Sequence, residues 1–204
     1  MRRRFIPAAP TTQAELDINL DWFLVNHDPK ESLVKGDILH SDGLRVLLFS
    51  SDESLNILAR AQTILCDGTF RICPYLWYQV FVISAEFRDN SFVPVCFGLL
   101  PDKKRRSYDD FFNLLKDALE HPSRNLELSA EWMLSDFEHN IRASWESIFP
   151  GITGKGCHFH LYYVSFSNFP LKTRFYIIDC YTIIAFYVNC KIMLGPFNVI
   201  TIVA

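Results

Sequence analysis

The chain has 204 residues, of which 50% are hydrophobic, 15% aromatic and 21% charged, and its formal net charge is −3. This composition excludes a disordered or low-complexity protein and suffices for one domain with a sizeable core. The six cysteines are too few for a disulfide scaffold and form no Cys-x-x-Cys pair, so we expect reduced thiols in an intracellular protein. Because the net charge is close to neutral, any nucleic-acid interface must come from local features.

The composition of the sequence divides the chain into three parts. Residues 1–44 are polar and contain several Pro and Gly residues, so we expect an irregular N-terminal arm. Residues 45–160 contain the predicted elements of one domain. Residues 161–204 form a divergent apolar tail with only four charged side chains, Lys172, Arg174, Asp179 and Lys191. Three interpretations of the tail are a membrane anchor, a buried part of the same domain and a segment foreign to the fold. The charged Asp179 in the middle of the apolar stretch argues against a membrane anchor.

The first predicted elements of the domain are a strand over 44–49 and a helix over 51–61. Three strand-like runs then follow over 63–72, 76–87 and 92–100. Their short links indicate an antiparallel meander.

The second half of the domain alternates helices with strands. Ser107 begins a capping-box sequence, so we expect it to cap a helix that ends before Pro122. A strand over 131–135 follows, then a helix with an apolar face and a strand over 155–159. The residues expected on that helix face are Phe137, Ile141, Trp145 and Ile148. Three antiparallel strands followed by parallel additions predict a mixed α/β sheet flanked by helices, which is the topology of the ribonuclease H-like fold.

Two aspartates end strands that this topology brings together. The right-handed crossover rule places the strand over 131–135 beside the strand that begins at residue 63. Asp67 and Asp136 would then lie side by side at one edge of the sheet, where a divalent cation would relieve the repulsion of the two carboxylates. Oxygen ligands of this kind suit Mg²⁺ or Mn²⁺. The alternatives are that Asp67 is a turn residue before Gly68 and that Asp136 caps a helix.

A series of short motifs runs through the same domain. They are Asp67-Gly68-Thr69-Phe70, Pro74, Tyr78-Gln79, Val93-Pro94-Val95, Leu99-Leu100-Pro101, Tyr108, Asp136-Phe137-Glu138, Phe149-Pro150 and Gly156-Cys157-His158-Phe159-His160. In this order and spacing, over about residues 45–160, they resemble the transposase domain of Mutator-like elements (MULE).

The resemblance implies a ribonuclease H-like domain that performs metal-dependent DNA cleavage and strand transfer in DNA transposition. Three acidic residues bind the catalytic Mg²⁺ or Mn²⁺ in that family, and Asp67 and Asp136 match the first two. The third is usually a downstream Glu, but this sequence has no Glu after Glu146 and only Asp179 as a later acid. We therefore expect a C-terminally incomplete transposase fragment without strand-transfer activity. The alternative is a domesticated remnant that binds DNA or protein without catalysis.

The resemblance also implies DNA, namely transposon ends, as partner and the nucleus as location. The sequence leaves open whether the protein forms a homo-oligomer, and we do not expect it to bind a membrane. Cys157 and His160 form a Cys-x-x-His pair with a structural or DNA-contact role, or they are core residues. Two ligands do not close a zinc site, so zinc is not expected.

One basic run and three aromatic residues are further candidates. The basic run is Lys103-Lys104-Arg105-Arg106. We expect it to contact DNA phosphates, to direct nuclear import or to be a solvated loop. Trp77, Tyr78 and Trp132 are expected in the core rather than as platforms for stacked bases.

Overall fold

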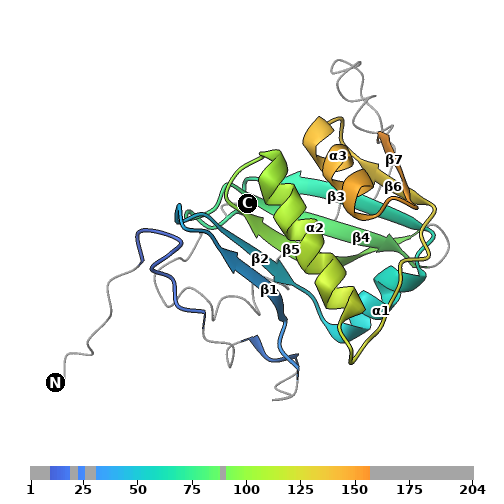
Figure 1. The fold of residues 1–204 in the computed structure, drawn as a ribbon, viewed down its shortest axis with the longest axis horizontal. Coiled ribbons are helices and arrows are strands. Elements are labelled where there is room, and N and C mark those ends of the chain that lie inside the picture. The colour runs from blue at the N-terminus through green and yellow to red at the C-terminus, as the bar shows by residue number, and fades with distance from the viewer. Residues whose placement is uncertain (1–9, 19–22, 26–30, 88–90, 157–204) are drawn as a thin grey trace, which may run out of the picture.

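The computed structural model describes residues 10–18, 23–25, 31–87 and 91–156 (Figure 1). Its elements in chain order are β1 (Val34–Leu39), β2 (Arg45–Phe49), α1 (Asp52–Arg60), β3 (Thr63–Thr69), β4 (Gln79–Glu86), β5 (Phe92–Leu100), α2 (Arg105–Glu120), β6 (Trp132–Ser135), α3 (His139–Ile148) and β7 (Thr153–Gly156). Cys157, His160 and the apolar tail lie outside the described residues. No helix within the described ranges is long and apolar enough to cross a membrane.

Seven strands form one mixed sheet in the order β1-β2-β5-β4-β3-β6-β7. The strands β3, β4 and β5 pair antiparallel, as the short links between them predicted. The strand β6 pairs in parallel with β3, and β7 pairs in parallel with β6. The crossover argument, which placed β6 beside β3, is therefore confirmed, and the described region is a mixed α/β structure.

The sheet is buried on both faces because its central strands are apolar at successive positions. In β2, Val46 and Leu48 join the buried side chains of all three helices in one cluster. Leu47 and Phe49 point to the opposite face, where they pack with Phe23 and other residues from outside the helices. Successive side chains of a strand point to opposite faces, so a continuous apolar run is what two covered faces require.

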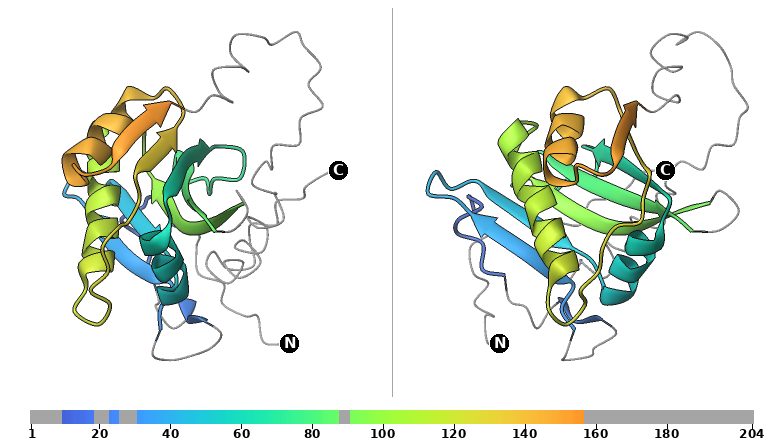
Figure 2. Two further views of the ribbon diagram at one scale, coloured as in Figure 1. Left: turned by 90° about the vertical axis from the view of Figure 1, so that its right-hand side faces the viewer. Right: turned by 45° about the vertical axis from the view of Figure 1, so that its right-hand side comes forward.

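The helices α2 and α3 lie next to each other on one face of the sheet (Figures 1 and 2). Their contact with the sheet is built from edge-on aromatic pairs. Phe81 of β4 meets Phe111 and Phe112 of α2, and Phe112 meets Trp145 of α3, with ring centroids 5.2–5.9 Å apart. Gly98 of β5 makes room for this packing, since an added Cβ would lie 2.4 Å from the Phe111 ring.

The expected irregular arm over 1–44 contains a strand, which is a correction to the sequence analysis. The strand β1 pairs antiparallel with β2 and extends the sheet by one strand. Lys35 and Asp37 interrupt its apolar pattern, but both form ion pairs, with Asp52 and Arg45 respectively. These partners lie in other elements, so the local sequence pattern did not indicate a strand.

The capping box predicted at Ser107 is also wrong. The helix α2 begins three residues earlier, with Lys104 as its N-cap, and Ser107 is buried inside the first turn. The carboxylate of Asp102 accepts hydrogen bonds from the Lys104 backbone N–H (2.9 Å) and the Ser107 hydroxyl (2.6 Å). An ionised carboxylate is a stronger acceptor than a hydroxyl, which explains the earlier start.

The helical spacing predicted Phe137 on the apolar face of α3, and this prediction is wrong. It precedes the helix, is 49% exposed, and packs its ring against Gly156 of β7. Ile141 and Trp145 are buried on that face as predicted. The last strand begins at Thr153, two residues before its expected start.

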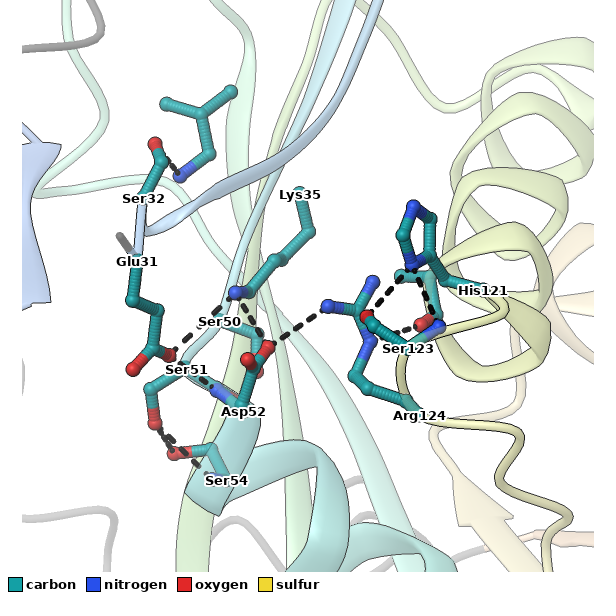
Figure 3. A network of polar contacts seen from close by, with 12 residues as sticks. Glu31, Ser32, Lys35, Ser50, Ser51, Asp52, Ser54, His121, Ser123 and Arg124 are labelled. Carbon is teal, nitrogen blue, oxygen red and sulfur yellow. Dashed lines mark hydrogen bonds and ion pairs between the residues drawn. The ribbon is translucent and has the colours of Figure 1, made fainter. Parts of the chain in front are cut away.

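A polar network connects β1, α1 and the loop after α2 (Figure 3). The Lys35 ammonium lies 2.7 Å from the Asp52 carboxylate and 3.5 Å from that of Glu31, and its side chain is only 7% exposed. Arg124 donates to the same Asp52 oxygen at 2.9 Å. Burial alone would raise the pKa of Asp52, but the hydrogen bonds and charges of Lys35 and Arg124 outweigh it and lower that pKa.

The network predicts a specific loss of stability in Asp52→Asn. Because the side chain is 42% exposed, solvent screens the pair, and we expect a loss of about 1 kcal/mol of unfolding free energy. The pKa of Asp52 is depressed below its ordinary 3.8, so this stabilisation is complete above that value and disappears as the pH falls through the lower folded-state value. Urea unfolding at pH 7 and at acidic pH measures both effects.

Glu53→Gln is the matched control, since Glu53 is an exposed acid in the same first turn of α1. Both variants remove one negative charge from the helix N-terminus. Equal losses in the two variants would show that the Asp52 ion pairs add nothing.

Candidate functional site

One edge of the sheet collects the ends of five elements. The carboxyl end of β3 lies beside the amino end of β4, with Thr69 opposite Val80. The carboxyl end of β5 meets the same end of β4, with Leu100 opposite Gln79. The helix α2 begins directly after β5, and β6 ends next to β3. Residues from distant parts of the sequence therefore meet at this edge.

Asp67 and Asp136 both lie at this edge. The parallel pairing of β3 with β6 ends at Cys66 opposite Ser135, and Asp67 and Asp136 are the residues that directly follow this last pair. Both aspartates are half-buried. The turn interpretation of Asp67 does not apply, because Asp67 and Gly68 lie inside β3 and pair with β4.

Both carboxylates act on the buried thiol of Cys66. Burial raises the pKa of Cys66 well above its ordinary value, and the negative charges of Cys96, Asp67 and Asp136 raise it further. Cys66, Cys73 and Cys96 are free thiols, as expected for the cysteines among the described residues.

Asp136 also fixes the start of the next segment. Its Oδ1 accepts a hydrogen bond from the backbone N–H of Glu138 at 3.2 Å. The N-cap of α3 is Glu138, so Asp136 is not the cap itself.

Glu138 is held by two elements of the sheet edge. Its Oε2 lies 2.7 Å from the Lys103 ammonium, and its Oε1 accepts a hydrogen bond of 2.8 Å from the Tyr108 hydroxyl. The Tyr108 oxygen in turn accepts a hydrogen bond from Gln79 Nε2 at 2.9 Å. This chain of contacts links β4, α2 and the segment that follows β6, and it occupies both oxygens of Glu138.

The protonation states in this cluster follow from its surroundings. Burial raises the pKa of Tyr108, and the neighbouring Glu138 and Asp136 charges add to that rise, although the Gln79 bond opposes it. The hydroxyl is therefore protonated and able to donate. Burial lowers the pKa of Lys103, but the hydrogen bond to Glu138 and the negative charges of Glu138 and Asp136 together outweigh that effect and raise the pKa, so the ammonium is retained at neutral pH.

The donor atoms of Asp67 and Asp136 fit a hard divalent cation. Mg²⁺ in phosphoryl-transfer sites is usually held by one or two carboxylates, with waters and substrate phosphates as the other ligands. No group of three or more His, Cys, Asp or Glu side chains within the described ranges is arranged to hold a metal ion. The acidic residue that follows Asp136 most closely in the sequence is Glu138, and both of its carboxylate oxygens already have partners.

The basic run lies at the start of α2, and each member is paired with an acid. Lys103 contacts Glu138, Lys104 contacts Asp102 at 3.3 Å, and Arg105 contacts Asp109 at 3.2 Å. Arg106 contacts Asp42 at 2.9 Å. The side chains of Lys104, Arg105 and Arg106 are 46–78% exposed, so these are surface pairs that contribute little stability.

The three strand aromatics have different surroundings. Trp77 is buried and its Nε1 donates to the Arg45 carbonyl, which confirms it as a core residue. Trp132 is half-buried beneath the Lys155 ammonium. Tyr78 is 53% exposed, so its expected burial is wrong.

The sequence analysis missed Gln79, Tyr108 and Glu138 as site residues, although each lies in a quoted motif. Tyr108 follows the apolar periodicity of α2 and therefore looked like an ordinary core residue. Its hydroxyl contacts become visible only when β4 and the end of β6 are placed beside it.

The sheet, the helices and this edge define the class of the protein as a mixed α/β domain with an acidic site at the carboxyl ends of parallel strands. Residues 63–163 match the model of the MULE transposase domain. This segment is therefore a MULE transposase domain, as the motifs predicted, and that domain implies a transposase-family role. No curated protein matches the chain.

The packing at this edge predicts that Gly68→Ala destabilises the protein. An added Cβ would lie 2.4 Å from Gln79 Oε1, and Gln79 is 1% exposed and bonded to Tyr108. Moving the Gln79 side chain breaks that contact, so we expect a loss of about 1–3 kcal/mol. Urea unfolding followed by tryptophan fluorescence measures it.

Gly151→Ala is the control, since nothing lies within 4 Å of the added Cβ. We expect it to be neutral or slightly stabilising. Similar midpoints for the two variants would contradict the close packing of Gly68 on Gln79.

Proposed function

We propose that this domain binds DNA at the sheet edge and holds a divalent cation between Asp67 and Asp136, as a ribonuclease H-like transposase core. The observation that supports this most directly is the parallel register of β3 and β6, because the two aspartates directly follow its last pair, Cys66 and Ser135. The strand order β5-β4-β3-β6-β7, with three antiparallel strands and two parallel additions, also agrees with that fold.

The cation is Mg²⁺ or Mn²⁺, and when bound it activates an attacking oxygen and stabilises the leaving one in phosphodiester cleavage and strand transfer. Asp67 and Asp136 supply the carboxylate ligands. Lys103 supplies a positive charge that interacts with Asp136. Tyr108 and Lys103 together hold Glu138 and so fix the segment after Asp136.

The exposed basic residues give the site an approach for DNA. Lys104, Arg105 and Arg106 follow Lys103 at the start of α2, where phosphates can replace their acidic partners. A chromosomal DNA substrate would require action in the nucleus.

Metal binding tests the proposal directly. We expect Mn²⁺ to bind the wild-type chain and its affinity to fall by about tenfold or more in both Asp67→Asn and Asp136→Asn. If one ion is shared, the double variant should be little weaker than either single variant, because the sites are coupled. Electron paramagnetic resonance of free Mn²⁺ measures the binding.

Glu131→Gln is the control, because Glu131 is exposed and precedes β6 at the opposite end of that strand. Unchanged affinity in either aspartate variant, or additive losses in the double variant, would contradict a shared ion.

The ligand count predicts the activity of this chain. The family uses three acids, and this sequence matches two, so the position of a bound ion is under-determined. We expect the 204-residue protein with Mg²⁺ or Mn²⁺ to join labelled DNA ends no more than a protein-free reaction does. Strong metal-dependent joining, lost in Asp136→Asn, would show that the two aspartates suffice or that another acid completes the site.

The alternative is that the domain binds DNA or protein without catalysis. The paired and exposed basic run favours DNA in that case, since its side chains do not depend on the metal. Under this alternative, replacing Asp67 and Asp136 with Ala leaves the biological effect of the protein intact, whereas a catalytic role requires its loss.

A further inference from the structure

Two exposed aromatic rings lie at the same edge of the sheet as the aspartates. Because they are exposed, their role is not to fill the hydrophobic core. Phe70 is 45% exposed and Tyr78 is 53% exposed. Their ring centroids are 5.5 Å apart, with an interplanar angle of 66°. We call Phe70 and Tyr78 the aromatic pair. Phe70 follows Asp67 by three residues, and Tyr78 directly precedes β4.

The backbone beneath the aromatic pair is fixed by hydrogen bonds. The Phe70 carbonyl accepts from the Cys73 N–H at 3.2 Å, and the Tyr78 N–H donates to the Leu100 carbonyl at 3.0 Å. The rings are therefore carried by the fixed ends of β3, β4 and β5, so little backbone freedom is lost when a ligand binds.

Positive charge borders the aromatic pair. The Lys103 ammonium lies 4.7 Å from the centroid of the Phe70 ring, and Lys104 to Arg106 follow it along the chain. Aromatic surface beside cations is the combination that binds unpaired nucleotides, because bases stack on the rings and phosphates contact the cations. A paired base has both faces covered in the duplex and cannot stack in this way.

We propose that the aromatic pair binds one unpaired base of the DNA that occupies the site. This inference rests on the proposed DNA-binding function. It adds that the site distinguishes DNA with an unpaired base from fully paired DNA. Tyr78 and Phe70 provide the stacking surface, and Lys103 and the basic run position the adjoining backbone. A base can stack on one of these rings, whereas two rings offer too little apolar surface to hold a protein helix.

Equilibrium binding of fluorescently labelled duplexes tests the inference, without divalent ions so that no cleavage interferes. One duplex is fully paired, and the other has the same sequence with one unpaired 2-aminopurine. We expect the wild-type chain to bind the second duplex about 5- to 150-fold more tightly and to quench the 2-aminopurine by stacking. Phe70→Ala and Tyr78→Ala should lose most of this preference, while Tyr78→Phe keeps it.

Phe87→Ala is the matched control, because Phe87 is 48% exposed and follows β4 at its opposite end. Equal binding of both duplexes by the wild type, without quenching, would overturn the inference and leave the proposed function in place. An unchanged preference in both alanine variants would also overturn it. Failure to bind any of the DNAs would overturn the proposed DNA function as well. The wild-type quenching measurement does not depend on how well the variants fold.

Discussion

The parallel pairing of β3 with β6 is the constraint on which the site depends. It joins two strands that are separated in the chain by an antiparallel meander and a long helix. A shift of one residue in this register would move Asp136 away from Asp67 and turn its side chain to the other face of the sheet. The register is set by burial, since Ile64 and Met133 are both fully buried against the helices and lie opposite each other.

The surroundings of the two aspartates restrict the site further. Tyr108, buried on α2, connects Gln79 of β4 to Glu138 beyond β6. The same aromatic helix face that fills the core therefore also fixes the polar edge of the sheet. Core packing and site geometry are coupled here, so substitutions such as those that crowd Gln79 should affect both stability and cation binding.

The sequence predicted those parts of the structure that depend on local patterns. The strand β5 was predicted with its observed bounds, because its apolar run is continuous and ends at Pro101. The strand β1 was missed, since the charges of Lys35 and Asp37 are compensated by residues in other elements. The approach of Asp67 to Asp136 followed from topology, whereas the Lys103–Glu138 contact joins residues far apart in the chain and has no local signal. The exposure of Tyr78 was not predicted, because strand periodicity does not indicate at which residue a strand begins.

The central claim is that one cation lies between the carboxylates of Asp67 and Asp136. Crystals of the protein grown with Mn²⁺ test it by anomalous X-ray scattering, which locates the metal without assumptions about its ligands. The account predicts an anomalous peak within coordination distance of a carboxylate oxygen from each aspartate. A well-ordered sheet edge with the two side chains on opposite faces, or with no such peak at saturating Mn²⁺, would contradict it.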